Sequence, residues 1–189
     1  MQAFADSQSM DKCIKAYTGS YDHTGDINFF SVTKHTDPIY QCFERDGDTS
    51  FWALEHTKEA SAIIHEKIMT TYRSLLEKNR ESAIEIIKEH YLESYPQKQD
   101  YPPLGKALEA FFSKPSWDMS INKDRWVVVF NGVAKWGQNN ARFTWTFSIK
   151  PKFKSGKLDG YSFNYSAKVN NNAVSNKVTN DMIGTVYLN

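Results

Sequence analysis

Runs of alternating apolar and polar residues between Trp117 and Val169 are the feature that most constrains the fold of this 189-residue chain. The clearest run extends from Phe143 to Ile149, where Phe, Trp, Phe and Ile alternate with Thr, Thr and Ser. Successive side chains of a strand point to opposite faces of a sheet. The pattern therefore predicts strands that bury one face of a sheet and expose the other.

The segments between the alternating runs are short and rich in turn-forming residues. They are Asn122 to Asp124, Gly137 to Asn140, and Lys154 to Gly160. Connections of this length join neighbouring strands as antiparallel hairpins. We therefore expect an antiparallel meander, to which the final residues DMIGTVYLN, from Asp181, add an edge strand.

Upstream of the strands, the hydrophobic period changes to that of a helix. From Thr57 to Tyr91 there is no Gly or Pro, and apolar residues recur every three or four positions. This predicts two helical segments that break near Lys78 and Asn79, or one long bent helix. A further helix is expected from Leu104 to Ser113, stopped by Pro115 because proline cannot continue the hydrogen-bond ladder.

Helices followed by antiparallel strands are typical of the α+β class. The expected architecture is N-terminal helices packed on one face of a curved sheet of four to five strands. The aromatic residues Phe111, Phe112 and Trp117 lie where the last of these helices meets the sheet. Because aromatic residues at such spacing usually belong to a core, we expect all three to form a buried joint.

The N-terminal region differs from the rest of the chain. Residues 1 to 10 are polar and predict a flexible lead, and residues 11 to 50 predict a loop and hairpin layer. We expect one α+β domain over 11–189, with this layer followed by helices in 57–113 and the sheet in 116–189. Ala3, Phe4 and Ala5 fit the small-x-small pattern of a signal-peptide cleavage site, which favours a periplasmic or extracellular protein.

Two cysteines, Cys13 and Cys42, occur in this N-terminal layer. In an oxidising compartment they could pair and close the segment with a disulfide, which would stabilise the fold by about 3–4 kcal/mol. We expect that disulfide. Two buried free thiols are the alternative.

Three strings of the sequence resemble a known pattern. They are GKALEAFFSKPSW from Gly105, WVVVFNG from Trp126 and FTWTFSI from Phe143. Together they are similar to small exported bacterial domains in which a helix with paired aromatics leads to a Trp and two strands. The resemblance covers about Leu104 to Asn170 and implies a cystatin-like or nuclear-transport-factor-like cone, a helix wrapped by a curved antiparallel sheet.

Motifs for catalysis, metal binding or cofactor binding are missing from the sequence. His65 and Glu66 begin like a zinc-protease helix, but Met69 stands where the second histidine ligand is needed. The remaining histidines, His23, His35, His56 and His90, are scattered. We therefore expect neither a metal nor a cofactor, and a binding protein rather than an enzyme.

The charge of the chain is balanced, with 23 Lys and Arg against 22 Asp and Glu. Such a balance gives no general attraction to nucleic acid. One local cluster stands out, beside the aromatics Trp136 and Phe153, which are expected to be exposed. Its members are Arg142, Lys150, Lys152, Lys154 and Lys157. Binding of an acidic partner is one interpretation, but a solvated sheet end is favoured.

Taken together, these features favour a non-enzymatic, extracytoplasmic bacterial module that binds another protein or a component of the cell envelope. The alternative is a small-molecule binder or enzyme of the cone type, with a pocket between helix and sheet. Its expected lining residues are Trp126, Trp145, Tyr161 and Tyr165.

Overall fold

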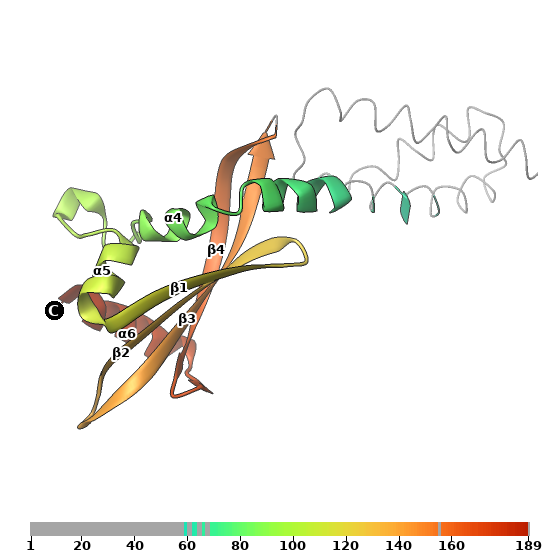
Figure 1. Ribbon diagram of the computed structural model, residues 1–189. Coiled ribbons are helices and arrows are strands. Elements are labelled where there is room, and N and C mark those ends of the chain that lie inside the picture. The colour runs from blue at the N-terminus through green and yellow to red at the C-terminus, as the bar shows by residue number, and fades with distance from the viewer. Residues whose placement is uncertain (1–58, 60–61, 64–65, 67–68, 155, 189) are drawn as a thin grey trace, which may run out of the picture. The chain divides into compact units, whose positions relative to one another are not determined.

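The computed structural model describes residues 59, 62–63, 66, 69–154 and 156–188 (Figure 1). The described residues divide into two compact units, one containing those up to Leu75 together with those in 152–160, and one containing Leu76–Pro151 and residues 161–188. The lead at 1–10, the layer at 11–50, and both Cys13 and Cys42 lie outside the described residues.

Helical residues precede the sheet. Residues 59, 62–63, 66 and 69–78 are helical, and after a turn the chain continues as α4 (Ser82–Lys88). The expected break near Lys78 is therefore confirmed. A 3-10 helix, η2 (Gln97–Gln99), and α5 (Leu104–Phe111) follow.

Five antiparallel strands form the sheet in chain order, which confirms the expected α+β class (Figure 1). They are β1 (Ser113–Asn122), β2 (Arg125–Trp136), β3 (Asn139–Lys154), β4 (Lys157–Val169) and β5 (Asn172–Ala173). The tight connections carry left-handed backbone, with φ of 57° at Lys123, 64° at Gly137 and 73° at Gly156. Positive φ in two-residue turns matches the twist of the strands and keeps them paired.

The alternating residues share one face of the sheet, as the sequence predicts. In register, Trp117 lies opposite Phe130, and Phe130 lies opposite Trp145. The buried positions of β3 alternate with half-exposed Thr144, Thr146 and Ser148. The expected register of β3, with these hydroxyls away from the core, is thus confirmed.

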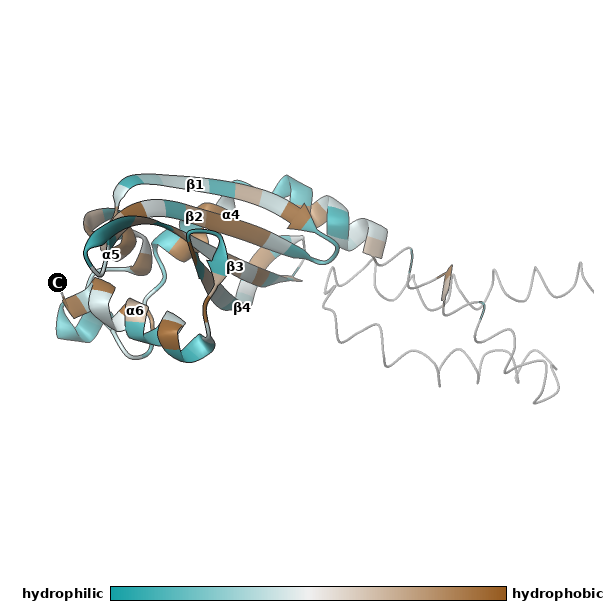
Figure 2. Cartoon of the chain, turned by 90° about the horizontal axis from the view of Figure 1, so that it is seen from below, coloured by the Kyte–Doolittle hydropathy of each residue, from teal (hydrophilic) through white to brown (hydrophobic). Residues whose placement is uncertain are grey.

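Helices cover the apolar face. Helix α4 packs against β1 and β2, and α5 contacts β1 and α6. Figure 2 shows α5 and α6 on the same side of the sheet. At the centre of the core, the indole Nε1 of Trp126 donates a hydrogen bond of 3.0 Å to the carbonyl of Leu76.

The final segment is a helix, so the expected edge strand at DMIGTVYLN is wrong. Helix α6 spans Asn176–Leu188 and buries Thr179, Met182, Ile183, Val186 and Tyr187. These positions are three or four apart, which is helical spacing. Ser175 precedes the helix and its hydroxyl accepts a hydrogen bond of 3.3 Å from the Val178 amide, as an N-cap does. The edge of the sheet is instead the short β5.

The joint between α5 and the sheet also differs from the expectation. Helix α5 ends at Phe111, before Pro115, and Pro115 lies inside β1. Phe112 is buried against the rings of Phe130 and Phe143 at 5.5 and 5.1 Å. Proline is tolerated there because β1 is an edge strand with a bulge.

Trp117 is only partly buried, so its expected full burial is wrong, but its ring packs on the core residue Phe130 with centroids 4.8 Å apart. Its Nε1 donates a hydrogen bond of 2.8 Å to Glu109, which also forms an ion pair of 3.1 Å with Lys88. These two interactions hold the pKa of Glu109 below its usual value. Trp117 therefore joins α5 to the sheet through a polar contact with Glu109 and an apolar contact with Phe130.

Phe153 was expected to be exposed and is not. It is 3% exposed, and its ring meets Tyr72 edge-on at 5.7 Å. Trp136 is 46% exposed, as expected. Along β3, Phe153 stands at a buried position, whereas its neighbours Lys152 and Lys154 stand at exposed positions.

Candidate functional site

An open cleft of about 630 Å³ combines aromatic and hydrogen-bonding side chains. We call it the Tyr161 cleft. Its walls come from the segment after α4 (His90 to Tyr95), from β4 (Tyr161 to Tyr165) and from α6 (Asn180 and Ile183). The volume lies within the range of small-molecule sites, about 300–1,000 Å³.

His90 is held in this cleft by three contacts. Its backbone carbonyl accepts a hydrogen bond of 2.8 Å from the Leu104 amide, at the start of α5. Its Nδ1 shares a hydrogen bond of 2.9 Å with the hydroxyl of Tyr161, and its ring meets Phe163 edge-on at 4.7 Å. These contacts fix both the backbone and the ring of His90. The second ring nitrogen, Nε2, has no hydrogen-bond partner among the described residues.

Burial sets the charge of the His90 and Tyr161 pair. It lowers the pKa of His90 and raises the pKa of Tyr161. Both shifts favour the uncharged forms, so near pH 7 the pair is a hydrogen bond between two neutral groups. A neutral imidazole offers one donor and one acceptor.

A second polar pair joins the two other walls. The hydroxyl of Tyr165, on β4, donates a hydrogen bond of 3.2 Å to Oδ1 of Asn180, on α6. Because the carbonyl oxygen of the amide is engaged, the NH₂ group of Asn180 stays available as a donor. The pKa of Tyr165 is raised, first by burial and then by Tyr95, so this phenol also remains protonated.

Stacked tyrosines support the wall of the cleft that contains Tyr95. Tyr95 stacks on Tyr187 with ring centroids 4.3 Å apart, and Tyr101 meets both rings edge-on. A Cβ atom on Gly184 would lie 3.3 Å from the Tyr95 hydroxyl, so the glycine makes room for that ring. Burial raises the pKa of Tyr187 to about 12, and its hydroxyl has no hydrogen-bond partner among the described residues.

The structure brings two of the four sequence-predicted pocket residues together. Tyr161 and Tyr165 line the Tyr161 cleft, whereas Trp126 and Trp145 are fully buried core residues. The indole Nε1 of Trp145 has no hydrogen-bond partner among the described residues. The sequence did not indicate His90 and Asn180 as site residues. His90 belongs to no sequence motif, and Asn180 lies outside the helices that the sequence predicts.

The expected basic cluster is not brought to one place. Arg142 lies near the β2–β3 turn, opposite Val133, while Lys152 and Lys154 lie near the other end of β3. Lys150 forms an ion pair of 3.7 Å with Asp124, whose pKa is lowered. Desolvation opposes that shift, and the hydrogen bond and charge of Arg125 outweigh it.

Comparisons with known proteins identify no family. The sequence matches no protein-family model and no curated protein, and the fold matches no solved structure. Within the described residues, no group of His, Cys, Asp and Glu side chains could hold a metal ion. None of the described helices has the length and hydropathy required to cross a membrane.

The state of His90 gives a testable pH dependence. Its pKa is lowered from the ordinary value of 6.5, so the unfolded chain binds a proton here at higher pH than the folded chain. The free energy of unfolding is therefore expected to decrease as the pH falls from 6.5 toward the folded-state pKa. An NMR titration of the His90 ring should show a pKa below 6.5.

The variant His90→Asn keeps a hydrogen-bonding group near Nδ1 but does not titrate. We expect it to lose less stability than the wild type between pH 7.5 and pH 5, measured by urea unfolding with about the same m-value. An equal loss in both proteins would show that other groups cause the pH dependence.

Proposed function

We propose that this protein is a binding module that takes an uncharged, hydroxylated ligand, a saccharide, in the Tyr161 cleft. The observation that carries the proposal is the lining of the cleft. Aromatic rings of Tyr161, Phe163 and Tyr165 adjoin neutral donors and acceptors from His90 and Asn180. Rings can pack on the apolar faces of a sugar, while hydroxyl and amide groups bond its hydroxyls.

The charge of the cleft supports an uncharged ligand. The raised tyrosine pKa values and the lowered His90 pKa leave these side chains neutral near pH 7. Glu93 is the single carboxylate among the lining residues, and it is exposed. An anionic ligand would find no cation in this lining.

A saccharide ligand agrees with the extracytoplasmic, envelope-binding role that the sequence favours. The placement of α5 and α6 on one face of an antiparallel sheet is compatible with a cystatin-like or nuclear-transport-factor-like cone. Both the cone type and the periplasmic or extracellular location remain parts of this proposal. They are supported by the helix-to-sheet order and by the Ala3-Phe4-Ala5 string.

The proposal is tested by titrating soluble oligosaccharides, including fragments of bacterial cell-wall glycans, into the full chain by calorimetry. We expect Asn180→Ala and Tyr165→Ala each to weaken the binding of a responsive saccharide by about ten-fold, because each removes a hydrogen-bonding group from the cleft. Asn164→Ala is the matched control, because Asn164 is an exposed asparagine next to Tyr165 on β4 and does not line the cleft.

Two outcomes would contradict the proposal. Binding that is equally strong in Asn180→Ala and Asn164→Ala would place the saccharide elsewhere. The absence of binding across a panel that covers neutral and amino sugars would remove the saccharide class. Unfolding midpoints of the variants would be measured alongside, so that loss of folding is recognised.

A second candidate is an enzyme of the cone type. It is favoured by one observation, the hydrogen bond between a neutral His90 and Tyr161 inside a cleft. A neutral histidine whose pKa lies below 7 can accept a proton as a general base. Conversion of a bound saccharide over hours, abolished in His90→Asn, would favour this candidate over a binding module.

A further inference from the structure

A second hollow lies on the opposite face of the sheet from the helices. It has a volume of about 340 Å³ and is lined by Lys114, Ser116, Asn131, Gly132, Val133 and Arg142. Asn131 and Val133 point away from the helices, because they alternate with the buried residues Trp126, Val128 and Phe130 of β2. The hollow is therefore separated from the Tyr161 cleft by the sheet itself.

A β-bulge shapes this hollow. Ser113 pairs with Val133 and Ser116 with Asn131, so β1 has one residue more than β2 between these pairs. The extra length places Lys114 in left-handed backbone with φ of 54°, and Pro115 follows it. The Ser113 hydroxyl fixes the bulge by donating a hydrogen bond of 2.9 Å to the Val133 carbonyl. Bulges of this kind redirect a side chain and are common beside functional sites.

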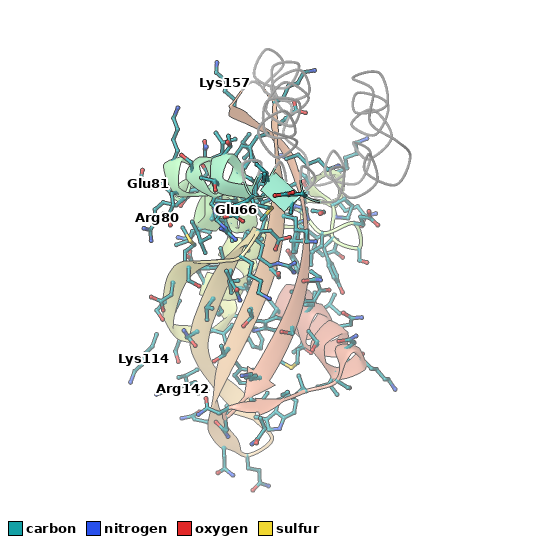
Figure 3. The ribbon with its side chains drawn as sticks, turned by 90° about the vertical axis from the view of Figure 1, so that its right-hand side faces the viewer. Glu66, Arg80, Glu81, Lys114, Arg142 and Lys157 are labelled. Carbon is teal, nitrogen blue, oxygen red and sulfur yellow. The ribbon has the colours of Figure 1, made fainter. Side chains whose placement is uncertain are left out.

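The charged groups at the hollow are cations. Lys114 and Arg142 belong to β1 and β3, on either side of β2, and lie at the same end of the sheet (Figure 3). Within the described part of the chain, neither side chain forms an ion pair, and no carboxylate lines the hollow. Asp118, two residues beyond Ser116, pairs with Val129 and is not part of the lining.

The neutral groups of the hollow add donors. The hydroxyl of Thr144 donates a hydrogen bond of 2.9 Å to Oδ1 of Asn131. That bond engages the oxygen of the amide and leaves its NH₂ group as a donor, beside the hydroxyl of Ser116. Two cations, an amide NH₂ and a hydroxyl match the charge and the acceptor oxygens of a tetrahedral anion.

We propose that this hollow, the Lys114–Arg142 hollow, binds a phosphate group. The guanidinium of Arg142 would bind two phosphate oxygens as a fork, and the ammonium of Lys114 would add a point charge. The volume exceeds that of a bare ion and leaves room for part of the molecule that carries the phosphate. A soluble phosphomonoester and the head group of a phospholipid share this chemistry.

The first test uses inorganic phosphate and amide NMR spectra of the full chain at low ionic strength. We expect saturable shifts confined to the amides of Ser113 to Ser116 and of Gly132 and Val133. In the double variant Lys114→Gln with Arg142→Gln, affinity should fall at least ten-fold, because both charge-assisted contacts are lost. Lys177→Gln, which removes an exposed lysine of α6 on the helix side of the sheet, should bind phosphate as the wild type does.

A second measurement distinguishes the two sources of phosphate. Co-sedimentation with vesicles that contain phosphatidic acid in phosphatidylcholine, lost in the double variant, would assign the site to a phospholipid. Phosphate binding without vesicle binding would assign it to a soluble phosphomonoester. The proposal is overturned if phosphate causes no shifts at these amides, or if the same shifts persist in the double variant with an unchanged unfolding midpoint.

Discussion

Trp126→Ala is expected to lower the free energy of unfolding by about 3–5 kcal/mol, the largest effect of any substitution considered for this protein. The Trp126 side chain is fully buried, and its neighbours in register are Ile121 and Ile149. Alanine would leave a cavity in the core and leave the Leu76 carbonyl without its indole donor. Urea unfolding followed by far-UV circular dichroism measures the loss.

Two matched variants make the Trp126 result specific. Trp136→Ala changes the same residue type on the same strand, but Trp136 is 46% exposed, so we expect a loss of no more than about 1 kcal/mol. Trp126→Phe retains an aromatic ring and removes the hydrogen bond to Leu76, so its loss should fall between the two. Equal losses in both alanine variants would show that Trp126 is not in the core.

Gly105→Ala is expected to destabilise the protein by about 3 kcal/mol, although alanine ordinarily stabilises a helix interior relative to glycine. Gly105 lies in α5, and a Cβ atom there would be 2.5 Å from the Cα of Lys88. No rotamer change can relieve a contact with backbone, so α4 and α5 would have to separate. The Lys88–Glu109 ion pair between these elements would be disturbed as well.

The control for Gly105 is Gly160→Ala. Gly160 lies in β4, and a Cβ atom there would meet nothing within 4 Å. Alanine at an unstrained, open position reduces the entropy of the unfolded chain, so we expect a change near zero or a slight gain. Thermal unfolding of both variants compares them directly. A stabilised Gly105→Ala protein would contradict the close approach of α4 and α5.

The sheet could be predicted from the sequence because the alternation within each strand shows which of its side chains are buried. Phe143, Trp145, Phe147 and Ile149 alternate with hydroxyl residues over a length that no helix would tolerate, and the turns between strands are short. The α+β class, the strand order and the outward position of Thr144 followed from that local pattern. No knowledge of distant contacts was needed.

The predictions were wrong where the patterns of a helix and a strand overlap in the sequence, or where tertiary contacts determine which side chains are buried. In α6, Thr179 and Asn180 obscure the helical spacing of Met182, Ile183 and Val186, and the apolar residues resemble a short strand. Trp117 has the alternation of a core residue and packs on Phe130, but β1 is an edge strand, so the indole is only partly buried and donates to Glu109 at the surface. Burial at an edge depends on which neighbours exist, and the sequence pattern of one strand does not contain that information.

The candidate site was harder to predict for the same reason. Tyr161 and Tyr165 share one strand face and could be assigned from alternation. His90 and Asn180 join them through hydrogen bonds that span 71 and 15 positions of the sequence. Such contacts leave no periodic signal, so the cleft is visible only in the folded chain.

The order of the strands has a consequence for how the protein forms during synthesis. Strands β1 to β4 pair with their neighbours in chain order, so the sheet contains mainly local pairings that close quickly as the chain emerges. Asn180 and Ile183 of the cleft belong to α6, which follows every strand. A nascent chain that has reached β4 can therefore have a paired sheet while the tyrosine face of β4 is not yet covered by α6. The cleft acquires its third wall only when α6 has left the ribosome.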